Sequence, residues 1–280
     1  MKHRTPSTQV AFGVEPNRRA PYELRQSRYQ YLAERINREF QQSITRQVLG
    51  VDVLDVGMQR GITLRYLEPY LDAIRTSETP IDVRLHGVDL FPRGKRRVYR
   101  RKDWTLHQLD VSEGMPTLES DRYDIVICEQ LLEHLQDYWP TLRDLERVLK
   151  PGGLLIIGVP TFPHGVHRMR PHVVRLGNMI FGFRRRGHVQ QFSLRTLRQD
   201  LSQLESLEVV EERGFRIVSG GPLRPLEFHC WWWRFNRWLG ARVPGLCTEV
   251  QVHLRKRSAV GPLGFSPPNA PVERLCGSGV

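Results

Sequence analysis

The sequence predicts an α/β protein with a doubly wound, mainly parallel sheet of seven strands. Short apolar runs of strand length alternate with segments whose apolar residues recur at helical spacing. The runs are mainly apolar, which is typical of parallel strands covered by helices on both faces. Turn residues separate several of these elements, most clearly in the sequence Lys150-Pro151-Gly152-Gly153.

The expected elements follow one another in the order that such a sheet requires. Tyr31, Leu32, Ile36 and Phe40 recur at helical spacing and predict an N-terminal helix or helix pair over residues 22–49. The expected strands are residues 51–56, 83–88, 105–109, 124–128, 154–159, 207–218 and 248–254. The expected helices between them are residues 62–74, 139–149 and 194–204.

A single domain over residues 21–257 accounts for these elements. Two segments, about 162–187 and about 221–245, interrupt the alternation and are expected to be insertions. Residues 1–20 and the tail 258–280 have the composition of disordered segments. No apolar run approaches the ~20 residues of a membrane-spanning helix, and the four cysteines form no disulfide framework. These features predict a cytoplasmic protein.

The net charge of +12 is concentrated outside the middle of the chain. Residues 160–190 contain six Arg and no acid, and residues 221–257 contain seven Lys or Arg against two Glu. A basic rim of this kind suits an anionic substrate, a nucleic acid or an anionic membrane surface. A solvated surface explains the same charge equally well.

Acidic residues stand at the ends of the first three expected strands. Asp55 is followed by Gly57, which lets the backbone approach a ligand closely because it has no Cβ. Asp89 ends the second strand and can accept hydrogen bonds from a ribose diol, and Asp110 after the third can accept from an exocyclic amine. A ligand of such a sheet lies beyond the carboxyl ends of the strands. The three acids therefore favour a nucleoside with a cationic amino-acid arm.

Six motifs occur in a fixed order along the chain. They are Asp55-Val56-Gly57-x-x-x-Gly61, Asp89, Leu109-Asp110-Val111, Tyr123-Asp124-Ile125-Val126, Leu132-Glu133-His134 and Leu149-Lys150-Pro151-Gly152-Gly153. In order and spacing, the chain from about residue 50 to about residue 220 resembles class I S-adenosylmethionine-dependent methyltransferases. It is most similar to the broad group that contains ubiquinone-biosynthesis O-methyltransferases. The resemblance implies a Rossmann-like methyltransferase sheet preceded by N-terminal helices.

The resemblance also implies the residues that contact S-adenosylmethionine. The expected set is Asp55, Gly57, Gln59, Gly61, Asp89, Leu90, Asp110, Val111 and Glu129. Gln59 replaces the family's usual middle glycine, so its side chain can crowd the methionyl carboxylate or reshape the turn. For any one strand-end Asp, a capping or turn role explains its position as well, but the ordered set favours a cofactor site. NAD is not expected, because the sequence lacks GxGxxG.

Methyl transfer to oxygen or nitrogen requires alignment of the nucleophile and removal of a proton. The catalytic candidates are Glu133, His134 and His188. Similar family members carry Glu-x-x-Glu-His and a later His, which in some bind a divalent metal. Here the first Glu is Gln130, a weaker ligand for a hard cation, so no metal is expected. A structural role, in which Glu133 and His134 fix the loop and cap the next helix, stays open, as does the role of His188.

The second insertion contains the sequence Trp231-Trp232-Trp233 among arginines, which suits a membrane interface. Consecutive Trp residues cannot all face one side of a helix, so some are expected to pack on the body. The first insertion combines apolar residues with Arg and suits a lid over the substrate, or packing against the sheet edge.

The leading functional hypothesis is methyl transfer from S-adenosylmethionine to a small-molecule or lipid-like acceptor, at oxygen in the first place, with carbon and nitrogen as alternative acceptor atoms. A peripheral contact with an anionic membrane would accompany a lipid-like acceptor. One alternative is an RNA methyltransferase, which the basic rim suggests, although no RNA-binding motif is present and nucleic acid is not the expected partner. Another is a catalytically impaired cofactor-binding scaffold, which Gln59 and Gln130 suggest. The oligomeric state is left open.

Overall fold

The computed structural model describes residues 27–58, 61–90, 104–163, 189–217 and 221–258 of the chain. The helices are α2 (Ser27–Thr45), α3 (Ile62–Arg75), α4 (Trp139–Val148), α6 (Leu194–Leu201) and α7 (Cys230–Arg242). The 3-10 helices are η3 (Val111–Glu113), η4 (Leu132–His134), η5 (Gly221–Phe228) and η6 (Pro244–Leu246). The strands are β1 (Gly50–Val56), β2 (Asp82–Asp89), β3 (Trp104–Gln108), β4 (Tyr123–Glu129), β5 (Leu149–Pro160), β6 (Leu207–Phe215) and β7 (Glu249–Lys256).

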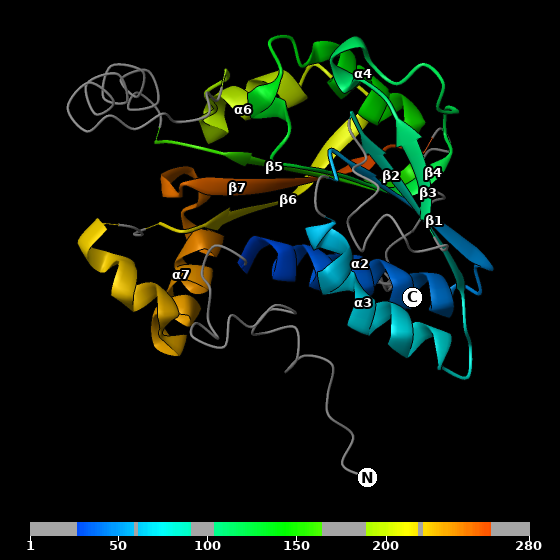
Figure 1. The fold of residues 1–280 in the computed structure, drawn as a ribbon, viewed down its shortest axis with the longest axis horizontal. Coiled ribbons are helices and arrows are strands. Elements are labelled where there is room, and N and C mark those ends of the chain that lie inside the picture. Colours follow the sequence, from blue (N-terminus) through cyan, green and yellow to red (C-terminus); the bar gives the residue numbers. More distant parts are fainter. Residues whose placement is uncertain (1–26, 59–60, 91–103, 164–188, 218–220, 259–280) are drawn as a thin grey trace, which may run out of the picture.

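The seven strands form one sheet in the order β3-β2-β1-β4-β5-β7-β6. β1 to β5 are mutually parallel, whereas β7 is inserted antiparallel between β5 and β6. Helices α4 and α6 cover one face of the sheet, and α2, α3 and α7 cover the other (Figure 1). The predicted mainly parallel, seven-stranded, doubly wound sheet is confirmed.

Apolar side chains fill the space on both sides of the sheet. Leu142 and Leu145 of α4 are fully buried on one face, and Leu32, Ile36 and Phe40 of α2 are fully buried on the other. The three α2 residues are four positions apart, so they share one side of the helix. Because both faces of the sheet are covered, the central strands read as continuous apolar runs.

Several element boundaries differ from the expected ones. β5 begins at Leu149 rather than at residue 154, and the predicted turn lies within the strand, where its pairing with β4 shifts register. β6 ends at Phe215 rather than at residue 218, because Arg216 adopts a left-handed backbone conformation with φ of 61°. Within the described part of the expected N-terminal helical region, residues 27–45 form α2 and residues 46–49 lie beyond its end.

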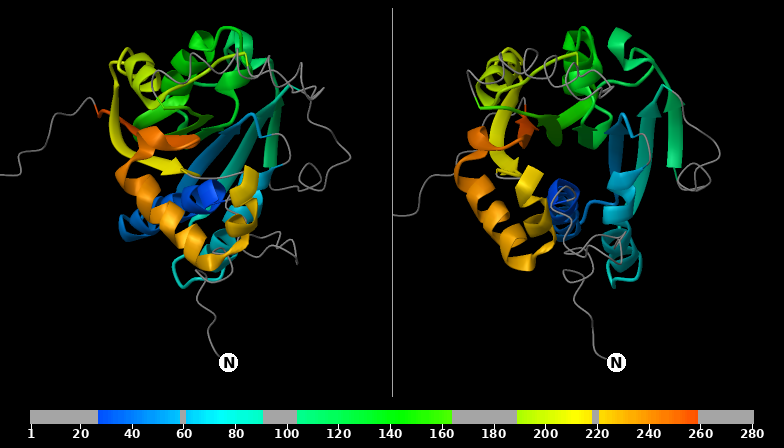
Figure 2. Two further views of the ribbon diagram at one scale, coloured as in Figure 1. Left: turned by 90° about the vertical axis from the view of Figure 1, so that its left-hand side faces the viewer. Right: turned by 60° about the vertical axis from the view of Figure 1, so that its left-hand side comes forward.

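The second expected insertion contains η5, α7 and η6, and α7 lies beside α2 at the β6 end of the sheet (Figure 2). Arg237 of α7 forms an ion pair with Glu34 of α2 at 2.8 Å. The first expected insertion lies outside the described residues from residue 164 to residue 188. Among the helices of the described residues, none is both long and apolar enough to cross a lipid bilayer.

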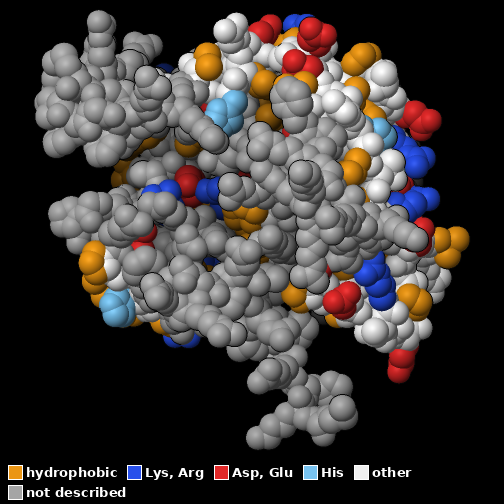
Figure 3. Space-filling model, viewed as in Figure 1, with side chains coloured by type: hydrophobic (Ala, Val, Ile, Leu, Met, Phe, Trp, Pro, Cys, Tyr) orange, Lys and Arg blue, Asp and Glu red, His pale blue; other side chains and the backbone are white. Residues whose placement is uncertain are grey.

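The charge of the described surface is mixed in sign. In the view of Figure 3, Lys and Arg side chains stand beside Asp and Glu side chains rather than in one continuous basic patch. The six arginines of residues 160–190, on which the expected basic rim depends, lie outside the described residues, so the basic rim stays a prediction.

Candidate active site

A small cavity lies where β1 and β4 end, at the carboxyl edge of the sheet. Its lining residues come from α2, β1, the β1–α3 turn, α3 and β4: Tyr29, Asp55, Gly57, Met58, Ile62, Thr63, Glu129 and Gln130. Parallel sheets of this kind bind ligands at this edge, where the strand order reverses. Three residues of the expected cofactor set, Asp55, Gly57 and Glu129, thus share one cavity.

The β1–α3 turn needs glycine at two positions. Gly57 has φ of 75° and Gly61 has φ of 62°, a left-handed region that residues with a Cβ rarely adopt. A Cβ on Gly57 would also lie 3.0 Å from Cδ1 of Leu131. The N–H groups of Gly57 and Met58 both donate to the carbonyl oxygen of Val88, which ties the turn to the end of β2.

Asp55 is a buried carboxyl group at the floor of this cavity. Its pKa is raised to about 7, chiefly by burial and also by the carboxylates of Glu129 and Asp89, against a hydrogen bond from Thr63. Its Oδ2 atom has no hydrogen-bond partner among the described residues. Asp55 therefore offers an open acceptor atom to a bound cation or donor.

Glu129 ends β4 and is held by residues from both ends of the chain. Nε of Arg28, in the first turn of α2, lies 3.5 Å from its Oε2 atom, and Gln251 of β7 donates to its Oε1 atom. Burial raises the pKa of Glu129 to about 7, against the Arg28 charge and the Gln251 hydrogen bond. Gly158 on β5 leaves room for the carboxylate, since a Cβ there would clash with it.

Arg28 connects a second carboxylate to the same cluster. Its Nη1 atom lies 2.7 Å from Oε1 of Glu249, the first residue of β7, and Nη1 of Arg216 lies 2.9 Å from the same oxygen. The guanidinium also lies 4.5 Å from the ring centroid of Tyr29. The first turn of α2 is thus fixed over the carboxyl edge of the sheet.

Gln130 follows β4 in a strained conformation. Its φ of 54° is left-handed, and its N–H donates to the carbonyl oxygen of Gly158 at 2.8 Å. Its side-chain Nε2 atom is buried with no hydrogen-bond partner among the described residues. Strained non-glycine residues concentrate at functional sites, where the surrounding structure enforces them.

Glu133 and His134 lie together in η4, one turn after β4. The pKa of Glu133 is raised to about 8, chiefly by burial and also by the carboxylates of Glu129 and Glu249. Oε1 of Glu133 lies 3.9 Å from Nε2 of the half-exposed His134, whose pKa is lowered by burial. The carbonyl oxygen of Glu133 accepts hydrogen bonds from Val189 and Gln190, so η4 also supports the segment before α6.

The remaining expected cofactor residues lie at the ends of β2 and β3. Asp89 is half-buried and its charge acts on Asp55, while Leu90 is 43% exposed. Asp110 is exposed and caps η3, because its Oδ1 atom accepts from the N–H and hydroxyl of Ser112. These hydrogen bonds lower the pKa of Asp110. The capping role that the sequence left open is therefore present here.

Val111 is buried in the core, and its carbonyl oxygen accepts from Thr141 of α4 at 2.6 Å. Gln59 and His188 lie outside the described residues. No cluster of three or more His, Cys, Asp or Glu side chains suited to a metal ion occurs in the described ranges. The expected independence of metal stays a prediction.

The sequence analysis missed the contributions of α2 and β7 to this site. Arg28, Tyr29, Glu249 and Gln251 belong to no motif, and they meet the strand-end acids only after the chain folds. The local signal is weak: Glu249 and Gln251 alternate with Val250 and Val252 at the start of the strand.

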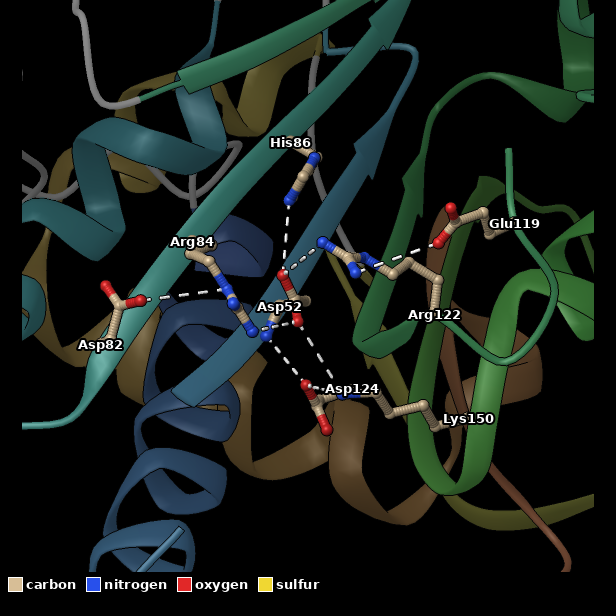
Figure 4. Close-up of polar contacts among 8 residues, drawn as sticks. All are labelled: Asp52, Asp82, Arg84, His86, Glu119, Arg122, Asp124 and Lys150. Carbon is tan, nitrogen blue, oxygen red and sulfur yellow. Dashed lines mark hydrogen bonds and ion pairs between the residues drawn. The ribbon is translucent and has the colours of Figure 1, made fainter. Parts of the chain in front are cut away.

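A larger cavity, of about 460 Å³, lies at the opposite, amino edge of the sheet. Beside it, the buried carboxylate of Asp52 is surrounded by cations: Nη2 of Arg84 at 2.6 Å, Nη2 of Arg122 at 3.7 Å and Nζ of Lys150 at 3.8 Å (Figure 4). Asp124 accepts from Lys150 and from the N–H of Asp52. This network cross-links β1, β2, β4 and β5 and serves the fold, because its charges are already paired with one another.

Comparison with known proteins identifies the class. A family model described as a methyltransferase domain matches residues 17–218, so the chain belongs to this family. The class is that of S-adenosylmethionine-dependent methyltransferases, and S-adenosylmethionine is its cofactor. The family, enzyme class and cofactor predicted from the ordered motifs are confirmed.

Two curated relatives match shorter parts of the chain. Demethylmenaquinone methyltransferase of Staphylococcus saprophyticus is 35% identical over 74 residues, which are 25% of this chain and 31% of the relative. Ubiquinone biosynthesis O-methyltransferase of Marinobacter nauticus is 27% identical over 142 residues, which are 49% of this chain and 51% of the relative. The chain thus spans about a third and about half of their lengths.

Solved structures with a similar chain course include the putative methyltransferase bound to the Trm112 methyltransferase activator of Haloferax volcanii. It is 18% identical, with a TM-score of 0.48, over 85% of this chain and 99% of that one. An S-adenosylmethionine-dependent methyltransferase from Mesorhizobium loti is 15% identical, with a TM-score of 0.48, over 75% of this chain and 92% of that one.

Proposed function

We propose that this protein transfers the methyl group of S-adenosylmethionine to an oxygen atom of a small-molecule or lipid-like acceptor. The observation that carries the proposal is the pairing of His134 with the buried carboxyl group of Glu133, which is close enough to Glu129 of the cavity for that carboxylate to raise the pKa of Glu133. A proton acceptor next to a cofactor site is what transfer to a hydroxyl requires.

The residues of the cavity fit the cofactor. S-adenosylmethionine carries a sulfonium, an ammonium and ribose hydroxyls, which are cationic or donate hydrogen bonds. Asp55 and Glu129 each present a buried oxygen with no hydrogen-bond partner among the described residues, and Asp89 lies close enough to influence Asp55. Asp55 and Glu129 would hold the cationic end and Asp89 the ribose. When bound, the cofactor supplies an electrophilic methyl group.

Asp110 and Val111 keep their proposed role at the adenine end, with Leu90 beside Asp89. Asp110 uses Oδ1 in its cap, so Oδ2 is the atom left to accept from the adenine amine. Gly57 and Gly61 shape the turn over which the methionine end would lie. Gln59 and His188 lie outside the described residues, and the family resemblance implies roles for them at the methionine end and at the acceptor side, respectively.

His134 is the proposed general base. Burial lowers the pKa of its imidazole, so the ring is neutral near pH 7 and can accept the hydroxyl proton. Glu133 is the positioning residue, 3.9 Å from the ring. An imidazolium formed on His134 would lower the pKa of Glu133 in turn, because a nearby positive charge favours the carboxylate. The new charge would then be balanced within the pair.

The acceptor class is supported by the two relatives. One is named for demethylmenaquinone and the other for O-methylation in ubiquinone biosynthesis, and both names refer to quinones. Oxygen is favoured because the longer of the two matches is to an O-methyltransferase.

The test uses S-adenosylmethionine labelled in its methyl group, incubated separately with a lipid extract, an aqueous metabolite extract and total RNA. We expect label in the lipid or metabolite extract as an acid-stable methyl ether. His134→Ala should lower kcat at least ~100-fold with unchanged cofactor affinity, and Glu133→Gln should lower it about tenfold and shift its pH profile.

Label in RNA alone would establish the RNA alternative. Cofactor binding without label in any fraction would establish the scaffold alternative. A matched control is Gln203→Ala, at an exposed position after α6, which should leave kcat unchanged.

A further inference from the structure

Helix α7 carries large aromatic side chains on its outer side. Trp231 is 58% exposed, Phe235 39% and Trp238 50%. Their spacing of four and three residues places them on one stripe of the helix, and Arg242 continues it. Rings of Phe235 and Trp238 lie 6.1 Å apart, and the Arg242 guanidinium lies 4.3 Å from the Trp238 centroid. We call these four residues the α7 outer face.

The opposite side of α7 is fastened to the protein. Asn236 is buried and accepts from the N–H of Ile217, and Gly240 packs against the backbone of Gly214. Trp233 packs under the guanidinium of Arg237, which pairs with Glu34. The orientation of the helix is therefore fixed, and the exposed aromatic stripe is not a product of fraying.

The charge around this stripe has one sign. Residues 228–248 contain Arg234, Arg237 and Arg242 and no Asp or Glu. Arg234 is exposed at the edge of the stripe. Large aromatic rings with flanking guanidinium groups are suited to the headgroup region of a bilayer, where the rings are half-buried and cations meet anionic lipids.

The position of the stripe relates it to the candidate active site. The chain leaves the sheet at Ile217 and returns at Thr248, whose N–H donates to the carbonyl oxygen of Arg216. The next residue, Glu249, contacts Arg28 and Arg216 in the site. In the sequence, Leu246 of η6 lies between α7 and Thr248, and it is 54% exposed.

We infer that the α7 outer face docks the protein onto an anionic lipid bilayer. Trp231, Phe235 and Trp238 enter the interface, and Arg234 and Arg242 meet the headgroups. The inference rests on the proposed function, because docking would serve methyl transfer to an acceptor in the lipid phase. A docked enzyme would take that acceptor directly from the bilayer. Docking itself is measured without any methyl transfer, so the two proposals fail separately.

The experiment is co-sedimentation of the full-length protein with vesicles of phosphatidylcholine alone or with roughly a third phosphatidylglycerol. We expect at least about tenfold stronger binding to the anionic vesicles and a blue shift of tryptophan emission. Trp231→Ala/Trp238→Ala should weaken this binding at least about tenfold. High salt and Arg242→Gln should each weaken it about threefold, because both reduce the attraction to anionic headgroups.

The matched control removes exposed apolar groups elsewhere. Val48→Ala/Leu49→Ala, in the turn before β1, should bind vesicles as the wild type does. Cofactor affinity of all variants, measured by calorimetry, should be unchanged. Negligible binding of the wild type, or equal binding of wild type and double aromatic variant, overturns the inference. A dimer that the double variant abolishes, without vesicle binding, would instead assign the face to a second copy of the chain.

Discussion

Buried carboxyl groups have different surroundings at the two edges of the sheet. At the amino edge, Asp52 lies within 4 Å of Arg84, Arg122 and Lys150. At the carboxyl edge, burial raises the pKa values of Asp55 and Glu133, and among the described residues neither carboxyl group forms an ion pair with a Lys or Arg. Asp52 and Asp55 are three positions apart on one strand, so the fold itself separates paired acids from unpaired ones.

The difference distinguishes a carboxylate that stabilises the fold from carboxyl groups that are available to a ligand. A buried carboxylate beside several cations holds strands together and has little left to offer a ligand. Buried carboxyl groups with open acceptor atoms cost stability, and such groups concentrate at functional sites. The larger cavity lies at the amino edge and the smaller at the carboxyl edge, so cavity size alone would have selected the wrong edge.

The largest expected effect compares the two ends of β2. Asp89→Ala should weaken binding of S-adenosylmethionine at least about tenfold, because losing a ribose contact costs ~1.5–3 kcal/mol. Asp82→Ala, at the amino end of the same strand, should leave the affinity within about twofold. Isothermal calorimetry measures both. Equal affinities in the two variants, with both folded, would remove the ribose assignment.

The second prediction compares Asp52 with Asp55 on β1. Asp52→Asn should lower the free energy of unfolding by about 2 kcal/mol, because it leaves three cations without their shared carboxylate. It should leave cofactor affinity unchanged. Asp55→Asn should do the reverse, with weaker cofactor binding and little loss of stability. Denaturant unfolding and calorimetry measure the pair, and a stability loss in Asp55→Asn as large as in Asp52→Asn would contradict the contrast.

The smallest expected effect concerns pH. The pKa of Glu133 is raised to about 8 in the folded protein, so the folded state keeps a proton that the unfolded chain releases above pH 4.5. Its contribution to stability is therefore full below pH 4.5 and is lost as pH rises toward 8. Glu133→Gln cannot ionise, so its unfolding free energy should fall less than that of the wild type between pH 5 and pH 8.

Urea denaturation of the wild type and of Glu133→Gln between pH 5 and pH 8 measures how steeply the unfolding free energy of each changes with pH. Glu119→Gln, at an exposed site near the amino edge, serves as the control and should retain the wild-type slope. Parallel curves for wild type and Glu133→Gln would show that the Glu133 carboxyl is ionised throughout.

The sequence by itself determined the fold class and the edge at which the site lies. Continuous apolar strands and helical periodicity are local patterns, so they can be recognised without knowing which strands pair. Asp55, Asp89 and Glu129 each end a strand, and the carboxyl ends of parallel strands meet at one edge. Their proximity follows from topology alone.

Only the tertiary structure decided which residues complete that site. β7 runs antiparallel, so it brings its first residues, Glu249 and Gln251, to the edge where the parallel strands end. The first turn of α2 adds Arg28 and Tyr29 from the other end of the chain. Contacts between residues so distant in sequence leave no periodic signal, because periodicity records only which side of its own element a residue faces.

The same limit applies to the tryptophans. The sequence established that Trp231, Trp232 and Trp233 could not all face one side, but not which would face outward. The structure exposes Trp231 and half-buries Trp232 and Trp233, and it adds Trp238 to the exposed stripe. Two contacts with the end of β6 decide the rotation of α7. The buried amide of Asn236 needs its hydrogen-bond partner, the N–H of Ile217. The close contact with the backbone of Gly214 needs a glycine at position 240.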